Sequence, residues 1–341
     1  MPWGLFQCPW HGASYQWGRP GANRRAAGAR AAGTASDLAR LCQGFTIFIM
    51  CDVESMSIHY SDGYEAYARC WMPSEPRGAV LYLHGIQSHS QWFEASARQL
   101  AASGLAVLMP DRRGSGRNRT DRGHVRSAKR WLRDVAECCN VLHVRTGLER
   151  FHLVGVSWGG KLALAAGCDL PHRVQSVTLI APGLFPVVDL PVIEKLKVAW
   201  AALVARRRLF DIPLQDPALF TANPDRQAFI RNDALALKKV TAGFLMASNS
   251  LDGYLRRRTV NECRIPLKLY LAGHDRIIDN ARTRAFVRQL PWQRCEITEY
   301  ADAHHTLEFE PDPSDFFDDL VAWLDTVTAD TADLLPTALR A

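Results

Sequence analysis

Residues 155–159 read Gly-Val-Ser-Trp-Gly, a G-x-S-x-G pattern centred on Ser157. The apolar run 151–154 before it is typical of a buried strand, and the run 161–166 after it is rich in helix-forming residues. A serine at such a strand-to-helix turn projects its hydroxyl above the sheet, beside a helix N-terminus that favours negative charge. With a base nearby, this hydroxyl can act as a nucleophile. Because glycine and serine are common, the pattern predicts a nucleophile only together with its strand and helix.

A serine nucleophile needs a base to take its proton and a carboxylate to orient that base. Asp275 follows a predicted strand and Gly273, at the edge of the sheet where ligands bind. Asp279 is an alternative, but Asp275 is better placed because it comes directly after the strand. Farther along the chain, His304 and His305 follow another predicted strand. One of these two histidines is the candidate base.

Acyl transfer also places negative charge on the carbonyl oxygen of the substrate, and preorganised backbone N–H groups stabilise that charge. One such donor is expected at Trp158, the residue after the nucleophile. The other is expected at Ile86, in the loop His84 to Ser90 that follows an apolar strand. Gly85 has no side chain and lets the backbone approach closely. The alternative for this loop is an ordinary strand-to-helix turn.

Strand and helix patterns alternate along most of the chain, which predicts a mostly parallel, doubly wound sheet. Two short strands around the turn 61–63 predict an antiparallel hairpin at the edge of the sheet. The other expected strands are 79–84, 105–109, 151–154, 174–180, 266–272 and 295–300, and the expected helices are 91–103, 125–145, 161–166, 281–290 and 313–326.

Residues 183–258 interrupt this alternation with helical patterns and no convincing strand, so a helical cap is expected after the sixth strand. Ile193, Leu196, Trp200 and Leu203 recur at helical spacing. We expect this apolar stripe to pack within the cap, with weak contact with a membrane surface as the alternative. The cap divides the predicted core into residues 45–182 and 259–328.

The two ends of the chain differ from this core. Residues 1–44 are rich in Gly, Ala and Arg and are expected to be disordered, because they offer little apolar surface to bury. Met50 and Met56 are both candidate start residues, and residues 329–341 are expected to form a C-terminal tail. Of the net charge of +6, residues 1–50 carry +4, from five arginines and one aspartate, which leaves +2 for the rest. This charge does not predict a nucleic-acid partner.

Other functional classes are disfavoured by the sequence. The nine cysteines show no C-x-x-C spacing, so neither a zinc site nor a disulfide framework is predicted, and we expect reduced thiols in a cytoplasmic protein. Residues 111–117 are glycine-rich but lack the ending of a phosphate-binding loop; they are expected to form a tight turn under the active site. No apolar run is long enough to predict a transmembrane helix.

Together these segments resemble the monoacylglycerol lipase and lysophospholipase branch of the α/β-hydrolases, also described as serine aminopeptidase-like hydrolases. The matching pieces lie within about residues 56–328 and are His84 to Ser90, Asp111 to Gly116, Gly155 to Gly159, Gly273 to Asp275, and His305. The resemblance implies the α/β-hydrolase fold, Ser157 as nucleophile, Asp275 as acid and His305 as base. It also implies oxyanion donors at Ile86 and Trp158 and no cofactor. His304 would then line the pocket as a neighbour. Within the cap no substrate-binding residue matches.

The expected activity is hydrolysis of a small-molecule carboxylic ester with an apolar acyl group, through a covalent acyl-enzyme. An aminopeptidase or amidase on the same triad is the main alternative, and it would need a carboxylate for the substrate ammonium. Glu194, Asp211, Asp216 and Asp225 are the candidates in the cap. Acyl transfer to an alcohol and a non-catalytic binding module are less favoured. The sequence does not indicate an oligomeric state.

Overall fold

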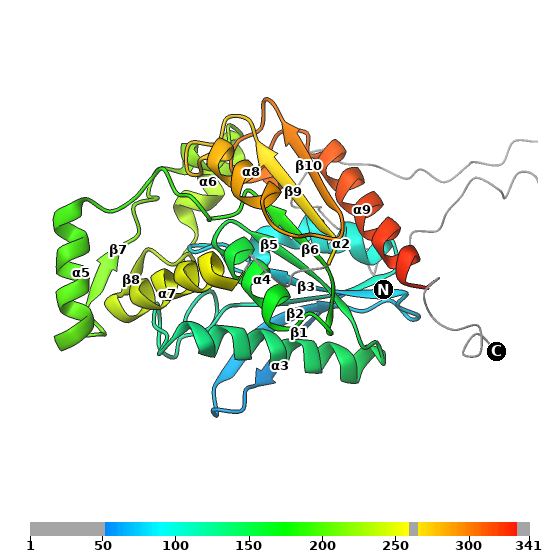
Figure 1. The fold of residues 1–341 in the computed structure, drawn as a ribbon, viewed down its shortest axis with the longest axis horizontal. Helices are drawn as coiled ribbons and strands as arrows, with labels where there is room; N and C mark the ends of the chain where they lie inside the picture. Colours follow the sequence, from blue (N-terminus) through cyan, green and yellow to red (C-terminus); the bar gives the residue numbers. More distant parts are fainter. Residues whose placement is uncertain (1–51, 259–264, 333–341) are drawn as a thin grey trace, which may run out of the picture. The chain divides into compact units, whose positions relative to one another are not determined.

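The computed structural model describes residues 52–258 and 265–332 (Figure 1). Residues 1–44, which were expected to be disordered, lie outside the described residues, as do residues 45–51 of the predicted core and most of the predicted tail. The last helix, α9 (Ser314–Ala332), continues past residue 328, where the core was expected to end.

Eight strands form one sheet, in the order β1-β2-β4-β3-β5-β6-β9-β10. The edge pair β1–β2 is antiparallel, as the hairpin pattern predicts, and β2 also runs antiparallel to β4. All the other neighbours are parallel. The strands are β1 (Val53–His59), β2 (Glu65–Trp71), β3 (Gly78–Leu83), β4 (Leu105–Pro110), β5 (Phe151–Val156), β6 (Val174–Ile180), β9 (Leu267–Ala272) and β10 (Cys295–Tyr300).

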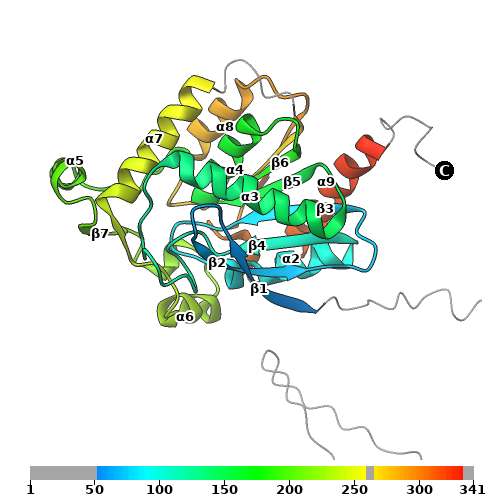
Figure 2. The same cartoon turned by 90° about the horizontal axis from the view of Figure 1, so that it is seen from below.

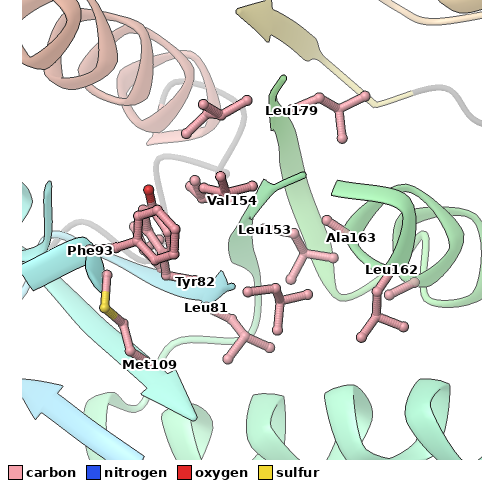
Figure 3. Packing of buried hydrophobic residues seen from close by; sticks show 14 of the residues in the cluster. Leu81, Tyr82, Phe93, Met109, Leu153, Val154, Leu162, Ala163 and Leu179 are labelled. Atoms are coloured by element: carbon pink, nitrogen blue, oxygen red, sulfur yellow. The ribbon is translucent and has the colours of Figure 1, made fainter. Parts of the chain in front are cut away.

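Five central strands, β3, β4, β5, β6 and β9, are buried along their whole length. Their mostly apolar sequences, buried on both sides, are what a parallel sheet covered on both faces requires. Figure 3 shows how Leu81 of β3, Leu153 of β5 and Leu179 of β6 pack with residues of the covering helices. The predicted doubly wound sheet is confirmed.

Helices cover both faces of the sheet (Figures 1 and 2). Gly167 of α4 (Trp158–Asp169) lies against Val177 of β6, whereas Trp323 of α9 donates a hydrogen bond of 3.0 Å to Thr178, the next residue of the same strand. Because adjacent strand residues point to opposite faces, α4 and α9 lie on opposite sides. The remaining core helices are α2 (Glu94–Ala102), α3 (Ala128–Thr146) and α8 (Asn280–Arg288), with short 3₁₀ turns η1 (Ser90–Phe93) and η3 (Leu307–Phe309).

The chain between β6 and β9 holds the segment expected to be a cap. It contains α5 (Val192–Val204), β7 (Leu209–Asp211), η2 (Pro217–Leu219), α6 (Pro224–Asn232), β8 (Lys239–Thr241) and α7 (Ala242–Arg258). The expectation that it holds no strand is wrong, because β7 and β8 pair as a two-stranded antiparallel sheet. Each of these strands has three residues, too few for a periodic pattern to be recognised in the sequence.

The apolar stripe of α5 is exposed, so the expectation that it packs within the cap is also wrong. Ile193, Leu196, Trp200 and Leu203 are 59%, 62%, 65% and 81% exposed. The helix instead buries its opposite face, through Val198 and Ala201. Because α5 is apolar on more than one side, helical periodicity alone could not identify the buried side.

The cysteines follow expectation at most described positions. Cys138, Cys139 and Cys295 are free, and burial raises the pKa of Cys139 to about 12, so this thiol remains protonated. Cys168, near the end of α4, is disulfide-bonded, which corrects the expectation that all the thiols are reduced.

Glu308, in η3, holds the N-terminus of α2. Its buried carboxylate accepts hydrogen bonds from the N–H groups of Ala95 (2.9 Å) and Ser96 (3.3 Å) and from the Ser96 hydroxyl. Burial nevertheless raises the pKa of Glu308 from 4.5 to about 7, against these hydrogen bonds. The folded protein therefore binds more protons than the unfolded chain between these pH values, and stability falls as pH rises through this range.

We predict that Glu308→Gln abolishes this pH dependence. The difference in unfolding free energy between wild type and variant should favour the wild type most below about pH 4, where the carboxyl is protonated in both the folded and the unfolded state. It should then shrink by up to about 3 kcal/mol by pH 8, as the native carboxyl ionises. Urea titrations of both proteins at each pH measure this difference in unfolding free energy. The contributions of the other titrating groups are the same in both proteins and cancel in the difference. A difference independent of pH would contradict the prediction.

Candidate active site

Ser157 lies at the turn from β5 into α4, with φ +52° and ψ −123°. The left-handed φ is unfavourable for a residue with a side chain. The turn is held by close backbone contacts: a Cβ at Gly159 would lie 2.2 Å from the Leu83 carbonyl oxygen, and one at Gly155 would lie 2.5 Å from the Gly159 carbonyl oxygen. Both flanking glycines of the motif are therefore required by the space around them.

Asp275 and His305 are brought together by the turns after β9 and β10. Nδ1 of His305 lies 2.7 Å from Oδ2 of Asp275, and both side chains are almost fully buried, at 2% and 0% exposure. The N–H groups of Ile277 and Ile278 donate to Oδ1 of the same carboxylate, at 2.8 and 3.0 Å. The carboxylate is thereby fixed, and a proton on Nδ1 leaves Nε2 as the acceptor of the imidazole.

Nε2 of His305 has no hydrogen-bond partner among the described residues. It borders a small cavity that Ser157 also lines, together with Ile86. No hydrogen bond between the Ser157 hydroxyl and this nitrogen is formed, which is common in the absence of substrate. The candidate nucleophile and the candidate base therefore border the same small cavity.

The alternative residues have structural contacts instead. Asp279 caps α8 by accepting a hydrogen bond from the N–H of Arg282 at 2.9 Å. His304 packs on the ring of His274 and lies 3.4 Å from Glu310. The expectation that His304 lines the pocket is wrong, because it borders neither cavity beside Ser157.

The two predicted oxyanion donors flank Ser157. A Cβ at Gly85 would lie 3.4 Å from the Ser157 Cβ, so the loop after β3 touches the serine turn. Trp158 is the first residue of α4, where backbone N–H groups have no partner within the helix. Ile86 lines both cavities beside Ser157. Among the described residues, neither the Ile86 nor the Trp158 N–H donates a backbone hydrogen bond outside the helices and strands.

A larger cavity of about 560 Å³ extends from Ser157 under the cap. Most of its wall is apolar, contributed by the loop after β6 and by α5, α7 and the segment after β7. The apolar lining includes Ile86, Trp158, Val188, Leu190, Val198, Ile212, Leu214, Val240, Leu245, Ile277 and Ile278. Its polar groups include Lys161, whose ammonium lies 2.6 Å from the Asp252 carboxylate.

A connection between the cap and the loop after β3 could not be predicted from the sequence. Oδ2 of Asp233, which follows α6, accepts hydrogen bonds from His89 Nε2 (2.9 Å) and Trp92 Nε1 (2.7 Å). Burial raises the pKa of Asp233, but these hydrogen bonds outweigh burial and lower it. The Leu237 N–H also donates to the Gln87 carbonyl. Only the spacing of His89 within residues 84–90 hinted at a role.

The sheet and this site place the protein among the serine hydrolases of the α/β-hydrolase fold. Residues 74–312 match the family described as serine aminopeptidase, S33, and the chain belongs to that family. The resemblance expected from the sequence is confirmed, within the monoacylglycerol lipase branch. The protein is a hydrolase of the lipase and esterase type.

Two relatives illustrate the similarity. The chain is 25% identical over 265 residues to the monoacylglycerol lipase of Mycolicibacterium smegmatis, covering 74% of this chain and 90% of the relative. It is 25% identical over 283 residues to human monoglyceride lipase, covering 80% and 91%. The solved monoacylglycerol lipase of Paleococcus ferrophilus superimposes with a TM-score of 0.70 at 21% identity, covering 77% of this chain and 100% of that one.

Proline iminopeptidase of Lactobacillus delbrueckii subsp. bulgaricus is 34% identical, but over only 118 residues, which are 34% of this chain and 40% of the relative. Within the described residues no helix is long and apolar enough to cross a membrane. The same part of the chain contains no group of three or more histidine, cysteine or acidic residues arranged to hold a metal ion.

We predict that Gly159→Ala prevents native folding around Ser157, because its Cβ would overlap backbone atoms that cannot move aside independently. The matched control is Gly147→Ala at the end of α3. Its φ of +71° is also left-handed, but no atom lies within 4 Å of the added Cβ. The control should lose only about 1 kcal/mol. Thermal unfolding of both variants measures the difference, and equal losses would contradict the prediction.

Proposed function

We propose that the protein hydrolyses carboxylic esters with an apolar acyl chain, through an acyl-enzyme formed on Ser157. The observation that carries this proposal is the buried Asp275–His305 pair, whose free imidazole nitrogen borders the cavity that Ser157 lines. The relatives named monoacylglycerol lipase and monoglyceride lipase support an ester of glycerol with one acyl chain as the substrate type.

In this mechanism the Ser157 hydroxyl attacks the ester carbonyl while Nε2 of His305 takes its proton. Asp275 holds the imidazole in the required tautomer and stabilises its protonated form. The N–H groups of Ile86 and Trp158 bind the oxygen that becomes negative. His305 then gives its proton to the leaving alcohol, and water activated by the same nitrogen releases the acid and regenerates Ser157.

The shape and lining of the larger cavity favour this class of substrate. Its volume of about 560 Å³ suits a molecule of lipid or drug size, and its wall is mostly apolar. The bound acyl chain would be removed from water along this wall, which stabilises long chains relative to short ones.

An aminopeptidase or amidase remains the second candidate, because an acidic group could bind a substrate ammonium. Of the four candidates from the sequence, Asp211 lines the cavity. Glu194 pairs with Lys197, Asp216 caps η2, and Asp225 is exposed in the first turn of α6. Asp189 and Asp252 also line the cavity, but all three of these aspartates lie against a lysine, Asp211 against Lys239 at 3.3 Å, which weakens the case for an ammonium site.

A panel of nitrophenyl esters of increasing acyl length, compared with aminoacyl anilides, tests the proposal. We expect kcat/KM to rise with acyl length, little turnover of anilides, and loss of nearly all turnover in Ser157→Ala. In that variant fluorophosphonate labelling should also disappear. Turnover of anilides alone would instead support the peptidase, and a folded wild type that neither turns over esters nor reacts with the probe would be a binding module.

We also propose that α5 contacts an anionic lipid surface. Six large apolar side chains of this helix are exposed, namely Val192, Ile193, Leu196, Trp200, Leu203 and Val204. Both views place α5 at the outer edge of the described segment (Figures 1 and 2). The exposed arginines 206–208 follow it directly. A helix with an apolar face beside a basic cluster suits a surface of anionic lipid, and residues of α5 also line the cavity that leads to Ser157.

The test compares wild type with the double variant Leu196→Glu, Trp200→Glu in sedimentation with phosphatidylcholine vesicles, with and without phosphatidylserine. We expect binding that is stronger to anionic vesicles, weakened by salt and reduced at least about tenfold in the variant. Val144→Glu, at a residue of α3 that is 82% exposed, is the control and should bind as wild type does. A concentration-dependent dimer that the double variant abolishes, without vesicle binding, would assign the surface to a second copy.

A further inference from the structure

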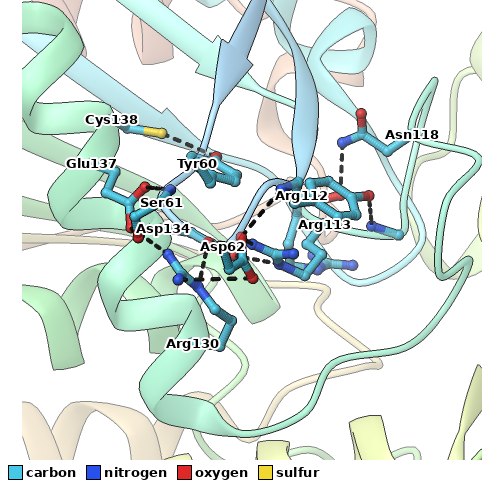
Figure 4. A network of polar contacts seen from close by, with 12 residues as sticks. Tyr60, Ser61, Asp62, Arg112, Arg113, Asn118, Arg130, Asp134, Glu137 and Cys138 are labelled. Carbon is cyan, nitrogen blue, oxygen red and sulfur yellow. Dashed lines mark hydrogen bonds and ion pairs between the residues drawn. The ribbon is translucent and has the colours of Figure 1, made fainter.

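Arg112 is a buried cation without an acidic partner. It follows β4 in the loop 111–117, is 8% exposed, and among the described residues no carboxylate lies within ion-pair distance of its guanidinium. Its neighbour Arg113 is equally buried but is paired with Asp134 and Asp62, at 2.8 and 3.1 Å (Figure 4). Burying an unpaired charge costs free energy. Groups other than carboxylates must therefore stabilise the Arg112 guanidinium.

Both hydrogen bonds of the Arg112 guanidinium go to the loop that carries a proposed oxyanion donor. Nη1 donates to the Gly85 carbonyl and Nη2 to the Ile86 carbonyl, each at 2.9 Å. The planar guanidinium therefore holds two consecutive peptide units at once. His84 reinforces the first contact, because its Nε2 accepts the Arg112 N–H (2.8 Å) and its Nδ1 lies 2.8 Å from the Gly85 carbonyl oxygen.

The first of these contacts fixes the direction of the Ile86 N–H. The Gly85 carbonyl and the Ile86 N–H belong to the same peptide unit, and they point in opposite directions because the unit is planar and trans. With the carbonyl held toward the guanidinium and the His84 ring, the N–H must point away from them. A carbonyl bound to a cation also polarises its peptide unit, which makes the attached N–H a stronger donor.

Arg112 also contacts the residue that carries the other proposed donor. Its guanidinium carbon lies 4.6 Å from the ring centre of Trp158 and 5.4 Å from that of Phe244. The Trp158 ring is held in turn by a hydrogen bond of 3.0 Å from its Nε1 to Ser248. One side chain thus packs against both segments that flank Ser157.

We propose that Arg112 is a positioning residue that orients the oxyanion hole, with its guanidinium holding the loop at Gly85–Ile86 against the Trp158 turn. This inference rests on the function proposed above. Burial lowers the pKa of Arg112 to about 9, opposed by Asp111, so the side chain remains charged at neutral pH. Its loss should raise the barrier to forming the tetrahedral intermediate more than it weakens ester binding.

Arg112→Lys keeps the charge and most of the side-chain volume but cannot bind both carbonyls in the same plane. Arg112→Met removes the charge as well. We expect kcat on a nitrophenyl ester to fall about tenfold in the lysine variant and about a hundredfold in the methionine variant, with KM changing less than threefold. Active sites are counted by the end point of fluorophosphonate labelling, so that unfolded protein does not enter kcat.

A second readout is the inhibition constant of an alkyl trifluoromethyl ketone, which forms a tetrahedral oxyanion on the serine. It should rise in parallel with the loss of kcat/KM, as expected for a lost transition-state interaction. Arg113→Lys is the matched control, because it alters a buried arginine of the same loop whose side-chain hydrogen bonds go to carboxylates and not to the loop at Gly85–Ile86, and it should change kcat less than threefold.

The outcomes separate this inference from the proposed function. If wild type does not hydrolyse esters, or Ser157→Ala retains turnover, the proposed function fails. If wild type is active, three results would overturn the role of Arg112. They are an unchanged kcat per active site in Arg112→Lys, a loss no larger than that of Arg113→Lys, or an inhibition constant for the ketone that does not follow kcat/KM.

Discussion

The site depends on one contact between two stretches of backbone. Gly159, at the start of α4, lies against the carbonyl oxygens of Leu83 and His84 at the end of β3. Because β3 and β5 are parallel neighbours, their carboxyl ends reach the same edge of the sheet, and the turns that leave them must pass each other there. The absence of a side chain at Gly159 sets how closely they pass. This distance brings the loop at Gly85 to Ser157, and the remaining groups are assembled around that pair.

The order of the core elements could be predicted from the sequence because the central strands are short, mostly apolar runs and helical patterns alternate with them. Asp275 and the pair His304–His305 were predicted for a related reason, since they lie in the turns after strands that end at this edge. The choice of His305 over His304 came from the family resemblance. The hydrogen bond between Asp275 and His305 requires only that β9 and β10 be adjacent and parallel. Periodicity and strand order thus account for the core and for the geometry of the histidine–aspartate pair.

The features that could not be predicted depend on contacts that produce no periodic pattern in the sequence. Arg112 binds backbone carbonyls about 26 residues earlier in the chain, and any residue type could supply those carbonyls. The arginine therefore belongs to no recognisable motif. Asp233 reaches His89 from 144 residues away. For α5, apolar residues on several sides leave the buried face to be decided by the neighbour, α7.

The buried basic side chains beside Ser157 are stabilised in different ways. Lys161 is neutralised by one carboxylate in the cavity wall, and Arg113 by two carboxylates within a larger network (Figure 4). His84 needs no charge partner, because burial lowers its pKa well below the usual value and the imidazole remains neutral. Arg112 alone among these is held by carbonyl oxygens and aromatic rings. Such groups can orient a guanidinium without cancelling its field, which then acts on the peptide units around the nucleophile.

The attachment of Asp233 to His89 and Trp92 makes the two ends of the cap unequal. At the α6 end, a buried carboxylate would have to give up its hydrogen bonds before the cap could separate from the core, and each such charge-assisted bond contributes about 1.5–3 kcal/mol. At the α5 end, an apolar helix face is already in water. Substrate entry from this side would leave the geometry of residues 84–90 undisturbed. The carboxylate that ties the cap to residues 84–90 thus lies at one end of the cap, and the exposed apolar face of α5 lies at the other.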